Sequence, residues 1–316
     1  MALLGELLVK VVSYYNVVPA ISKSQEKFDI LTKFIQGVNA AGDTGVLHQS
    51  NTLVNADVGV IQGWQHERGK NAPHLRLRQS VIDCTANKHV CTADANLFLY
   101  ANKSNTPHHY LRYSFDGVFR NTGIYFDKDV DPTRWQQISN DCNIKIEPPK
   151  KDGVHILICA QRDKGWAMGA LELDKWISST CMEIRKYSNR PIVIRLHPGD
   201  RQTQNRIPQI QHRIKTTLIG VTISRNADIH EDLKNCHAVV NHNSSSIVGP
   251  IIKGYSAFIT DAVTSQCAEV AHTNFSLIDA PIEFDRLSWL ERISMFHWKF
   301  SELEDGTAWK HIRQYV

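Results

Sequence analysis

Short apolar runs alternate with longer segments of helical periodicity along most of the chain. Residues 7–15 form a nearly continuous apolar run, which predicts a buried strand. Residues 22–38 then place Phe28, Leu31 and Ile35 at helical spacing. The remaining elements predicted in the first half are strands at 45–48, 58–63 and 89–92 and helices at 73–85 and from Asp131-Pro132 onward.

A polar stretch at 145–153 contains Pro148 and Pro149 and is typical of an interdomain linker. After it, the pattern predicts strands at 154–160, 191–196, 221–224, 238–241 and 257–260, alternating with helices at 171–187, 207–214, 228–236 and 244–253. Doubly buried strands that alternate with helices are typical of a parallel α/β sheet. We therefore expect an α/β protein with two Rossmann-like domains, at 1–146 and 153–280, and C-terminal helices at 281–316 that cross back to the first domain.

Composition narrows the possible classes. Hydrophobic residues make up 42% of the 316-residue chain and charged residues 22%, so a disordered chain is excluded. No apolar run is long enough for a transmembrane helix, and Glu6 and Lys10 interrupt the first apolar segment, which argues against a signal peptide. The seven cysteines are scattered without a Cys-x-x-Cys pair, so we expect neither a disulfide framework nor a zinc ribbon, and a cytoplasmic location.

Several enzyme signatures are missing from the sequence. It contains no Gly-x-Gly-x-x-Gly, no phosphate-binding loop that ends in Gly-Lys-Ser/Thr, no Gly-x-Ser-x-Gly and no His-Glu-x-x-His, which weakens the dehydrogenase, kinase, esterase and zinc-protease hypotheses. Asp127-Lys-Asp129 resembles a metal-binding pair of one glycosyltransferase class. Pro132 and a helix follow it directly, so helix capping and solvation explain these carboxylates. We expect no metal and no cofactor.

Three polar loops follow strands of the second predicted sheet, and the carboxyl ends of parallel strands meet at one edge. The first starts a helix with Ser244, Ser245 and Ser246, whose hydroxyls and free backbone N–H groups suit a phosphate. Plain N-capping is the alternative. The second loop carries Arg195 and His197, and the third carries Arg162, all candidates for an anionic ligand unless they belong to ordinary solvated turns.

The polar loops expected in the first domain offer candidate general bases. Asp116, Asp94 and His66 are the side chains that could deprotonate a hydroxyl group. Trp64 and Phe115, in the same loops, could stack on a sugar or a base. Each of these side chains taken singly is more often a structural turn residue.

The second half resembles the nucleotide-sugar-binding domain of GT-B glycosyltransferases, in particular capsule and Kdo-type transferases, through His197-Pro198 and the segment from Asn243 to Gly249. That resemblance implies two domains around a cleft, a donor held at the serine-rich helix start, and a ribose- or sugar-binding acid at Glu269. The sequence departs from the capsule pattern after Gly249, where Pro250-Ile-Ile-Lys253 stands. The first half is similar to glycosyltransferase-like proteins of tailed phages, through Gln62-Gly63-Trp64, 74–78 and 110–117.

The resemblance favours a metal-independent hexosyl- or pentosyltransferase with a nucleotide-diphosphate sugar as its donor, most simply a UDP-sugar. The donor-binding residues would be Arg162, Arg195, His197, Ser244, Ser245, Ser246 and Glu269. The catalytic base would be Asp116, with Asp94 and His66 as alternatives. A nucleotide-sugar epimerase and a non-catalytic nucleotide- or glycan-binding module remain alternatives.

The acceptor suggested by the phage resemblance is a hydroxymethylated pyrimidine in double-stranded DNA, with a cell-surface glycan as the alternative. The net charge of +4 and the basic residues of the first domain fit a phosphate backbone. Acceptor contacts would come from Trp64, Arg76, Arg78, Arg112 and Phe115, where Trp64, Phe115 or Tyr113 would fill the gap left by a flipped base. A solvated helix face explains Arg76 and Arg78 equally well. We expect a monomer or weak dimer in the cytoplasm, which for a phage protein is that of the host.

Overall fold

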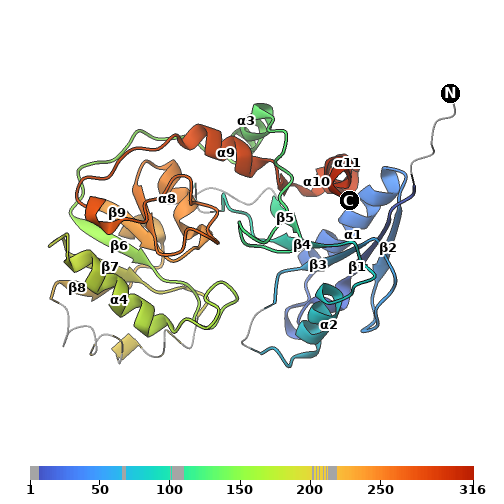
Figure 1. The fold of residues 1–316 in the computed structure, drawn as a ribbon, viewed down its shortest axis with the longest axis horizontal. Helices are drawn as coiled ribbons and strands as arrows, with labels where there is room; N and C mark the ends of the chain where they lie inside the picture. Colours follow the sequence, from blue (N-terminus) through green and yellow to red (C-terminus); the bar gives the residue numbers. More distant parts are fainter. Residues whose placement is uncertain are drawn as a thin grey trace.

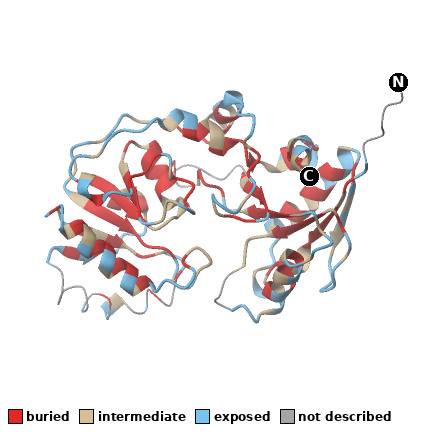
Figure 2. Cartoon of the chain, in the orientation of Figure 1, coloured by how far each residue is buried: buried red, intermediate tan, exposed pale blue. Residues whose placement is uncertain are grey.

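The computed structural model describes residues 7–65, 69–99, 101, 110–200, 203, 205, 207, 208, 210, 212 and 219–316. Figure 1 shows two lobes, each built around its own β-sheet. Figure 2 shows that the buried residues follow the strands of both sheets and the inner faces of their helices. This architecture confirms the predicted fold class of two Rossmann-like domains.

The sheet of the first lobe has the strand order β11-β5-β4-β3-β1-β2. Its strands are β1 (Lys10–Tyr14), β2 (Thr44–His48), β3 (Val58–Gln62), β4 (His89–Asp94), β5 (Leu111–Phe115) and β11 (His297–Trp298). β1 to β4 run parallel, whereas β5 is antiparallel to β4, and β11 is antiparallel to β5. The helices of this lobe are α1 (Gln25–Ala40), α2 (Pro73–Ile82) and α3 (Pro132–Asp141). Ser24 caps α1 by accepting a hydrogen bond from the Lys27 N–H.

The second sheet is parallel throughout, with the order β10-β9-β6-β7-β8. Its strands are β6 (His155–Cys159), β7 (Ile192–Arg195), β8 (Val221–Ile223), β9 (Cys236–Asn241) and β10 (Ser256–Ile259). Its described helices are α4 (Leu173–Arg185), α7 (Ile229–Asp232) and α8 (Val248–Ile252). Short 3-10 helices complete the described chain as η1 (Tyr15–Val17), η2 (Ala20–Ser22), η3 (Ser245–Ile247), η4 (Phe275–Leu277) and η5 (Arg313–Tyr315). Part of the helix predicted at 207–214 falls outside the described residues.

The C-terminal helices cross back to the first lobe, as predicted (Figure 1). α9 (Arg286–Ser294) packs against α3, while α10 (Phe300–Glu304) and α11 (Thr307–Ile312) pack against α1. The close approach of α1 and α10 requires a glycine, because a Cβ atom on Gly37 would lie 1.7 Å from the Leu303 carbonyl oxygen. This region also contains the short strand β11, which extends the first sheet by pairing with β5.

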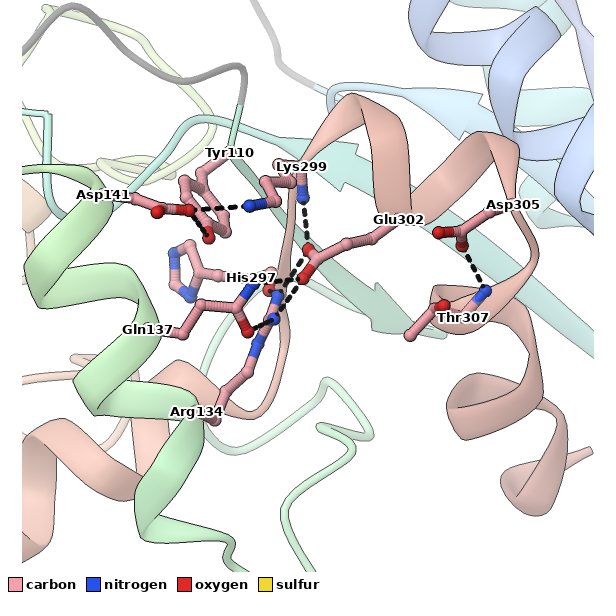
Figure 3. A network of polar contacts seen from close by, with 9 residues as sticks. All are labelled: Tyr110, Arg134, Gln137, Asp141, His297, Lys299, Glu302, Asp305 and Thr307. Carbon is pink, nitrogen blue, oxygen red and sulfur yellow. Dashed lines mark hydrogen bonds and ion pairs between the residues drawn. The ribbon is translucent and has the colours of Figure 1, made fainter.

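A buried network of polar side chains holds the C-terminal helices against the first lobe (Figure 3). The guanidinium of Arg134, on α3, donates to both carboxylate oxygens of Glu302, on α10, with one N–H···O distance of 2.8 Å. Gln137 and the Lys299 N–H also donate to Glu302, at 3.0 and 2.9 Å. Arg134 additionally donates to the His297 carbonyl oxygen. The charged ends are hydrogen-bonded on several sides, which burial of an ion pair requires.

The polar loop predicted to carry Phe115 and Asp116 is partly wrong, because Leu111–Phe115 form β5 and only the residues from Asp116 onward form a loop. Apolar and polar residues alternate along β5, which pairs with β4. Both Tyr113 and Phe115 are fully buried. The short polar residues between apolar ones look like a loop in the sequence, but here they occupy an interior antiparallel strand between β4 and β11. None of the described helices is both long and apolar enough to span a membrane.

Candidate active site

Two adjoining cavities lie where the lobes meet. The first, of about 500 Å³, has walls from both domains, including Asp94 and Phe119 from the first and Arg162 from the second. The second, of about 560 Å³, extends along the carboxyl edge of the second sheet. They share the residues Ala95, His197, Ser244 and Ser245. Their position matches the rule that open α/β sheets bind ligands beyond the carboxyl ends of their strands.

The predicted serine cluster lies at the junction of the two cavities. Ser244 and Ser245 line both cavities, and Ser246 lines the second. The Ser244 hydroxyl accepts a hydrogen bond from the Ser246 N–H at 3.1 Å, and the Asn241 side chain donates to the Ser244 carbonyl oxygen at 2.7 Å. Ser244 therefore caps η3, which runs into α8, so the N-capping alternative also holds for this residue.

Gln161 and Asn243, two amide residues that were not predicted as ligand-binding residues, hold these loops together. The Gln161 side chain donates to the Asn243 side chain at 2.7 Å. Asn243 in turn donates to the Thr264 hydroxyl at 2.7 Å and to the Ala167 carbonyl oxygen at 3.1 Å. The loops after β6, β9 and β10 are thus tied into one wall of the first cavity. In the sequence, Asn243 directly precedes the predicted serine cluster, and this position was the signal that could have identified it.

His197 and Arg162 both line the first cavity, so the two predicted strand-end loops do meet there. Burial, with a further contribution from the charge of Arg162, lowers the pKa of His197 below its ordinary value. His197 Nδ1 accepts the Gly199 N–H at 3.0 Å, which places the ring proton on Nε2. Lys164 lines the same cavity. The wall of the cavity therefore carries an imidazole and two cationic side chains, which suit an anionic ligand.

Arg195 lies in the wall of the second cavity, but its guanidinium is engaged by the protein. It pairs with the buried Asp232 at 2.7 Å and donates to the carbonyl oxygens of Asn226 and Ala227 at 2.8 and 2.7 Å. These contacts argue against the predicted diphosphate contact. Arg195 instead fixes the loop after β8, which forms one side of this cavity.

Asp94 and Arg112 face the first cavity from the other domain. They are directly opposite in the antiparallel register of β4 and β5, and Arg112 donates to the Asp94 carboxylate. Arg112 is 6% exposed, whereas the Asp94 side chain keeps 16% exposure toward the cavity. Asp94 is the one carboxylate among the described residues that line this cavity. The pair thus presents a charged carboxylate with an arginine behind it.

Asp116, the favoured base, lies elsewhere. Because β5 is antiparallel to β4, the chain reaches Asp116 at the opposite edge of the sheet from Asp94. Its carboxylate accepts the Val90 N–H at 2.8 Å and pairs with His89 at 2.6 Å, and it lines neither cavity. Its left-handed backbone, with φ of 61°, marks a tight turn. This placement argues against Asp116 as the base and favours Asp94 among the described candidates.

Most of the side chains predicted to contact DNA make contacts within the protein instead. Arg78 is buried and donates to the carbonyl oxygens of Trp64 and Val17, the latter at 2.9 Å. Phe115 stacks on the His89 ring with a centroid separation of 4.7 Å and is inaccessible. Arg76 is exposed on α2, as the solvated-face alternative expects, and neither it nor Trp64 lines the two cavities. His66, the third candidate base, lies outside the described residues.

Glu269 does not line the cavities either, contrary to its predicted donor role. Its carboxylate pairs with Arg292 of α9 at 2.8 Å and with Arg120 of the first domain at 3.5 Å. Arg292 also pairs with Asp127 at 3.0 Å. Asp127, the first carboxylate of the Asp127-Lys-Asp129 segment, therefore belongs to the same group of ion pairs. These residues connect the two domains at one side of the cleft.

No protein-family model matches the chain, and no curated protein does. Among solved structures, a β-Kdo 2,7-transferase KpsC from Thermosulfurimonas dismutans aligns over 97% of this chain and 100% of its own, with 12% identity and a TM-score of 0.49. A co-structure of MnaA and UDP from S. aureus aligns over 98% and 97%, with 11% identity and a TM-score of 0.34. A UDP-GlcNAc 2-epimerase from Methanocaldococcus jannaschii, in complex with UDP-GlcNAc and UDP, aligns over 98% and 100%, with 10% identity and a TM-score of 0.33.

Proposed function

We propose that the protein is a glycosyltransferase that uses a nucleotide-diphosphate sugar, with a UDP-sugar as the first donor to test. The observation that carries the proposal is the junction of the two cavities, where Ser244, Ser245 and His197 face Asp94 of the other domain. A donor that spans both cavities would have its diphosphate at this junction. Its reacting carbon would then lie in the cavity that contains the carboxylate.

The second cavity suits the nucleoside. Leu196, Pro198 and Ile229 supply apolar wall, and Arg195 holds the loop that closes one side. At the junction, the serine hydroxyls would donate to phosphate oxygens. Arg162 and Lys164 would offset the charge that develops on the departing nucleotide, so the reaction needs no metal ion.

Asp94 would act as the base. It would take the proton of an acceptor hydroxyl as that oxygen attacks the anomeric carbon, while the bond from this carbon to the phosphate oxygen breaks and the nucleotide leaves. Arg112 donates a hydrogen bond to the Asp94 carboxylate and so fixes its position in the wall of the cavity. Attack from the side opposite the leaving group would invert the anomeric configuration.

The test begins with a thermal-shift screen of nucleotide diphosphates and their sugars, because a bound donor stabilises the folded protein by mass action. Nucleotide release from the best donor is then measured. Asp94→Asn should lower it by roughly 10²–10⁴-fold, as expected for loss of a general base. Asp116→Asn, a matched change outside both cavities, should retain it. Equal losses in the two variants would refute the assignment, and an isomerised donor without an acceptor would identify an epimerase instead.

The hydroxymethylated pyrimidine acceptor suggested by the phage resemblance gains no support from the described side chains. Recognition of duplex DNA relies on cationic side chains that contact phosphates. Arg78 is turned into the fold, and Phe115 cannot replace a flipped base. The residues that line the first cavity are therefore the better guide to the chemistry of the acceptor.

A further inference from the structure

Two aromatic side chains, one from each domain, meet at the first cavity. Phe119 follows β5, and Trp166 lies in the loop after β6; their rings make an edge-to-face contact with centroids 5.2 Å apart. Both residues line the cavity and are half-buried. The neighbouring Arg120 N–H donates to the Thr264 carbonyl oxygen of the second domain at 3.1 Å, which holds this segment across the cleft.

Gln266 adds a buried amide to the wall of the same cavity. It is only 5% exposed, and its side-chain oxygen has no hydrogen-bond partner among the described residues. Its amide nitrogen contacts the Tyr125 hydroxyl, which itself donates to the Val118 carbonyl oxygen at 2.7 Å. A buried acceptor without a partner destabilises the protein. A ligand hydroxyl that donates to this oxygen would satisfy it.

A saccharide ring has the chemistry to do so. One of its hydroxyl groups can donate to the Gln266 oxygen, and the C–H face of a sugar ring packs against aromatic rings. Asp94 lies in the same cavity to take the proton of one hydroxyl. Building on the proposed function, we infer that Gln266, Phe119 and Trp166 form the acceptor subsite and that the acceptor is a carbohydrate. Its hydroxyl oxygen bonds to the anomeric carbon of the nucleotide sugar, its proton passes to Asp94, and the nucleotide leaves with the electron pair of the broken C–O bond.

The charges around this subsite fit a neutral sugar better than a DNA strand. Arg120, the cation on the Phe119 segment, is paired with Glu269. Arg112, the other described cation on this side of the cavity, is paired with Asp94. The two remaining cations that line the cavity, Arg162 and Lys164, come from the donor-binding domain. The acceptor side therefore presents hydrogen-bonding and aromatic surface with its positive charges already compensated.

The experiment uses the full chain with the donor identified by thermal shift. Nucleotide release is measured without acceptor, with a panel of methyl hexosides and pentosides, and with a duplex that contains hydroxymethylcytosine. At least one glycoside should accelerate release, and the duplex should not. Gln266→Leu and Trp166→Ala should raise KM for that glycoside by about tenfold or more, equivalent to about 1.4 kcal/mol. Donor hydrolysis in the absence of acceptor is measured for both variants, so that weaker acceptor binding is distinguished from weaker donor binding.

Tyr187→Ala, a truncation of a 44%-exposed aromatic residue just beyond the end of α4, is the matched control and should leave both rates unchanged. Absence of donor turnover would overturn the proposed function and this inference with it. Donor turnover that the duplex accelerates, or that no glycoside accelerates, would overturn the carbohydrate acceptor alone. A glycoside KM that neither substitution changes would overturn the subsite.

Discussion

Removal of the charge on Glu302 should destabilise the whole protein, because this carboxylate holds the C-terminal helices to the first domain. Glu302 and Arg134 are each 7% exposed and make two N–H···O contacts with one another (Figure 3). Glu302→Gln keeps the side-chain size and an oxygen that can still accept the Lys299 N–H. It leaves the Arg134 cation buried without a counter-charge. Breaking a buried pair in this way costs about 3–5 kcal/mol.

The free energy of unfolding is measured by urea denaturation followed by circular dichroism. The matched control is Glu304→Gln on the same helix, because Glu304 is 51% exposed and pairs with Lys33 at the surface. That change should cost less than about 1 kcal/mol. Arg134→Met combined with Glu302→Leu should recover part of the loss, since no isolated charge remains buried. A loss below about 1 kcal/mol for Glu302→Gln would refute the reasoning.

Three further predictions concern packing, pH and charge. Gly37→Ala should cost roughly 2–3 kcal/mol in urea denaturation, because a methyl group would overlap a carbonyl oxygen of α10. Burial lowers the pKa of His297 to about 3, so native stability should fall as pH drops from 6.5 toward 3, by at most about 1.4 kcal/mol per unit, and His297→Gln should flatten that slope. Arg195→Met should lower the thermal midpoint by leaving its aspartate partner unpaired, whereas Arg162→Met should raise the KM for the donor about tenfold with little change in that midpoint.

The sequence predicted the second domain better than the first, for a topological reason. All five strands of the second sheet are parallel, so each loop that follows a strand lies at the same edge. Ser244, His197 and Arg162 therefore meet at the cavities as expected. In the first domain, β5 reverses direction, and this carries Asp116 to the edge opposite Asp94. Hydrophobic periodicity indicates that a strand exists, but not which way it runs.

Side-chain partners were the second kind of information that the sequence could not supply. Arg195 and Glu269 were correctly identified as charged residues near strand ends, but their partners, Asp232 and Arg292, lie 37 and 23 residues away along the chain. Arg78 reaches a carbonyl oxygen that is 61 residues distant. No local pattern indicates contacts over such separations. A charged residue is available to a ligand only when the fold leaves its charge uncompensated.

Compensation of charge also determines what the first cavity can bind. Among the described residues that line it, three cationic side chains and one carboxylate leave a net charge of +2, because burial favours the neutral form of His197. Arg112 and Asp94 cancel as a pair, so the excess lies on Arg162 and Lys164 in the donor-binding domain. A nucleotide-sugar diphosphate carries two negative charges and matches this excess. The acceptor subsite has no such excess, because it is lined by the Arg112–Asp94 pair, the Gln266 amide and two aromatic rings. The division of charge between the domains therefore favours an anionic donor on one side and a neutral, hydroxyl-bearing acceptor on the other.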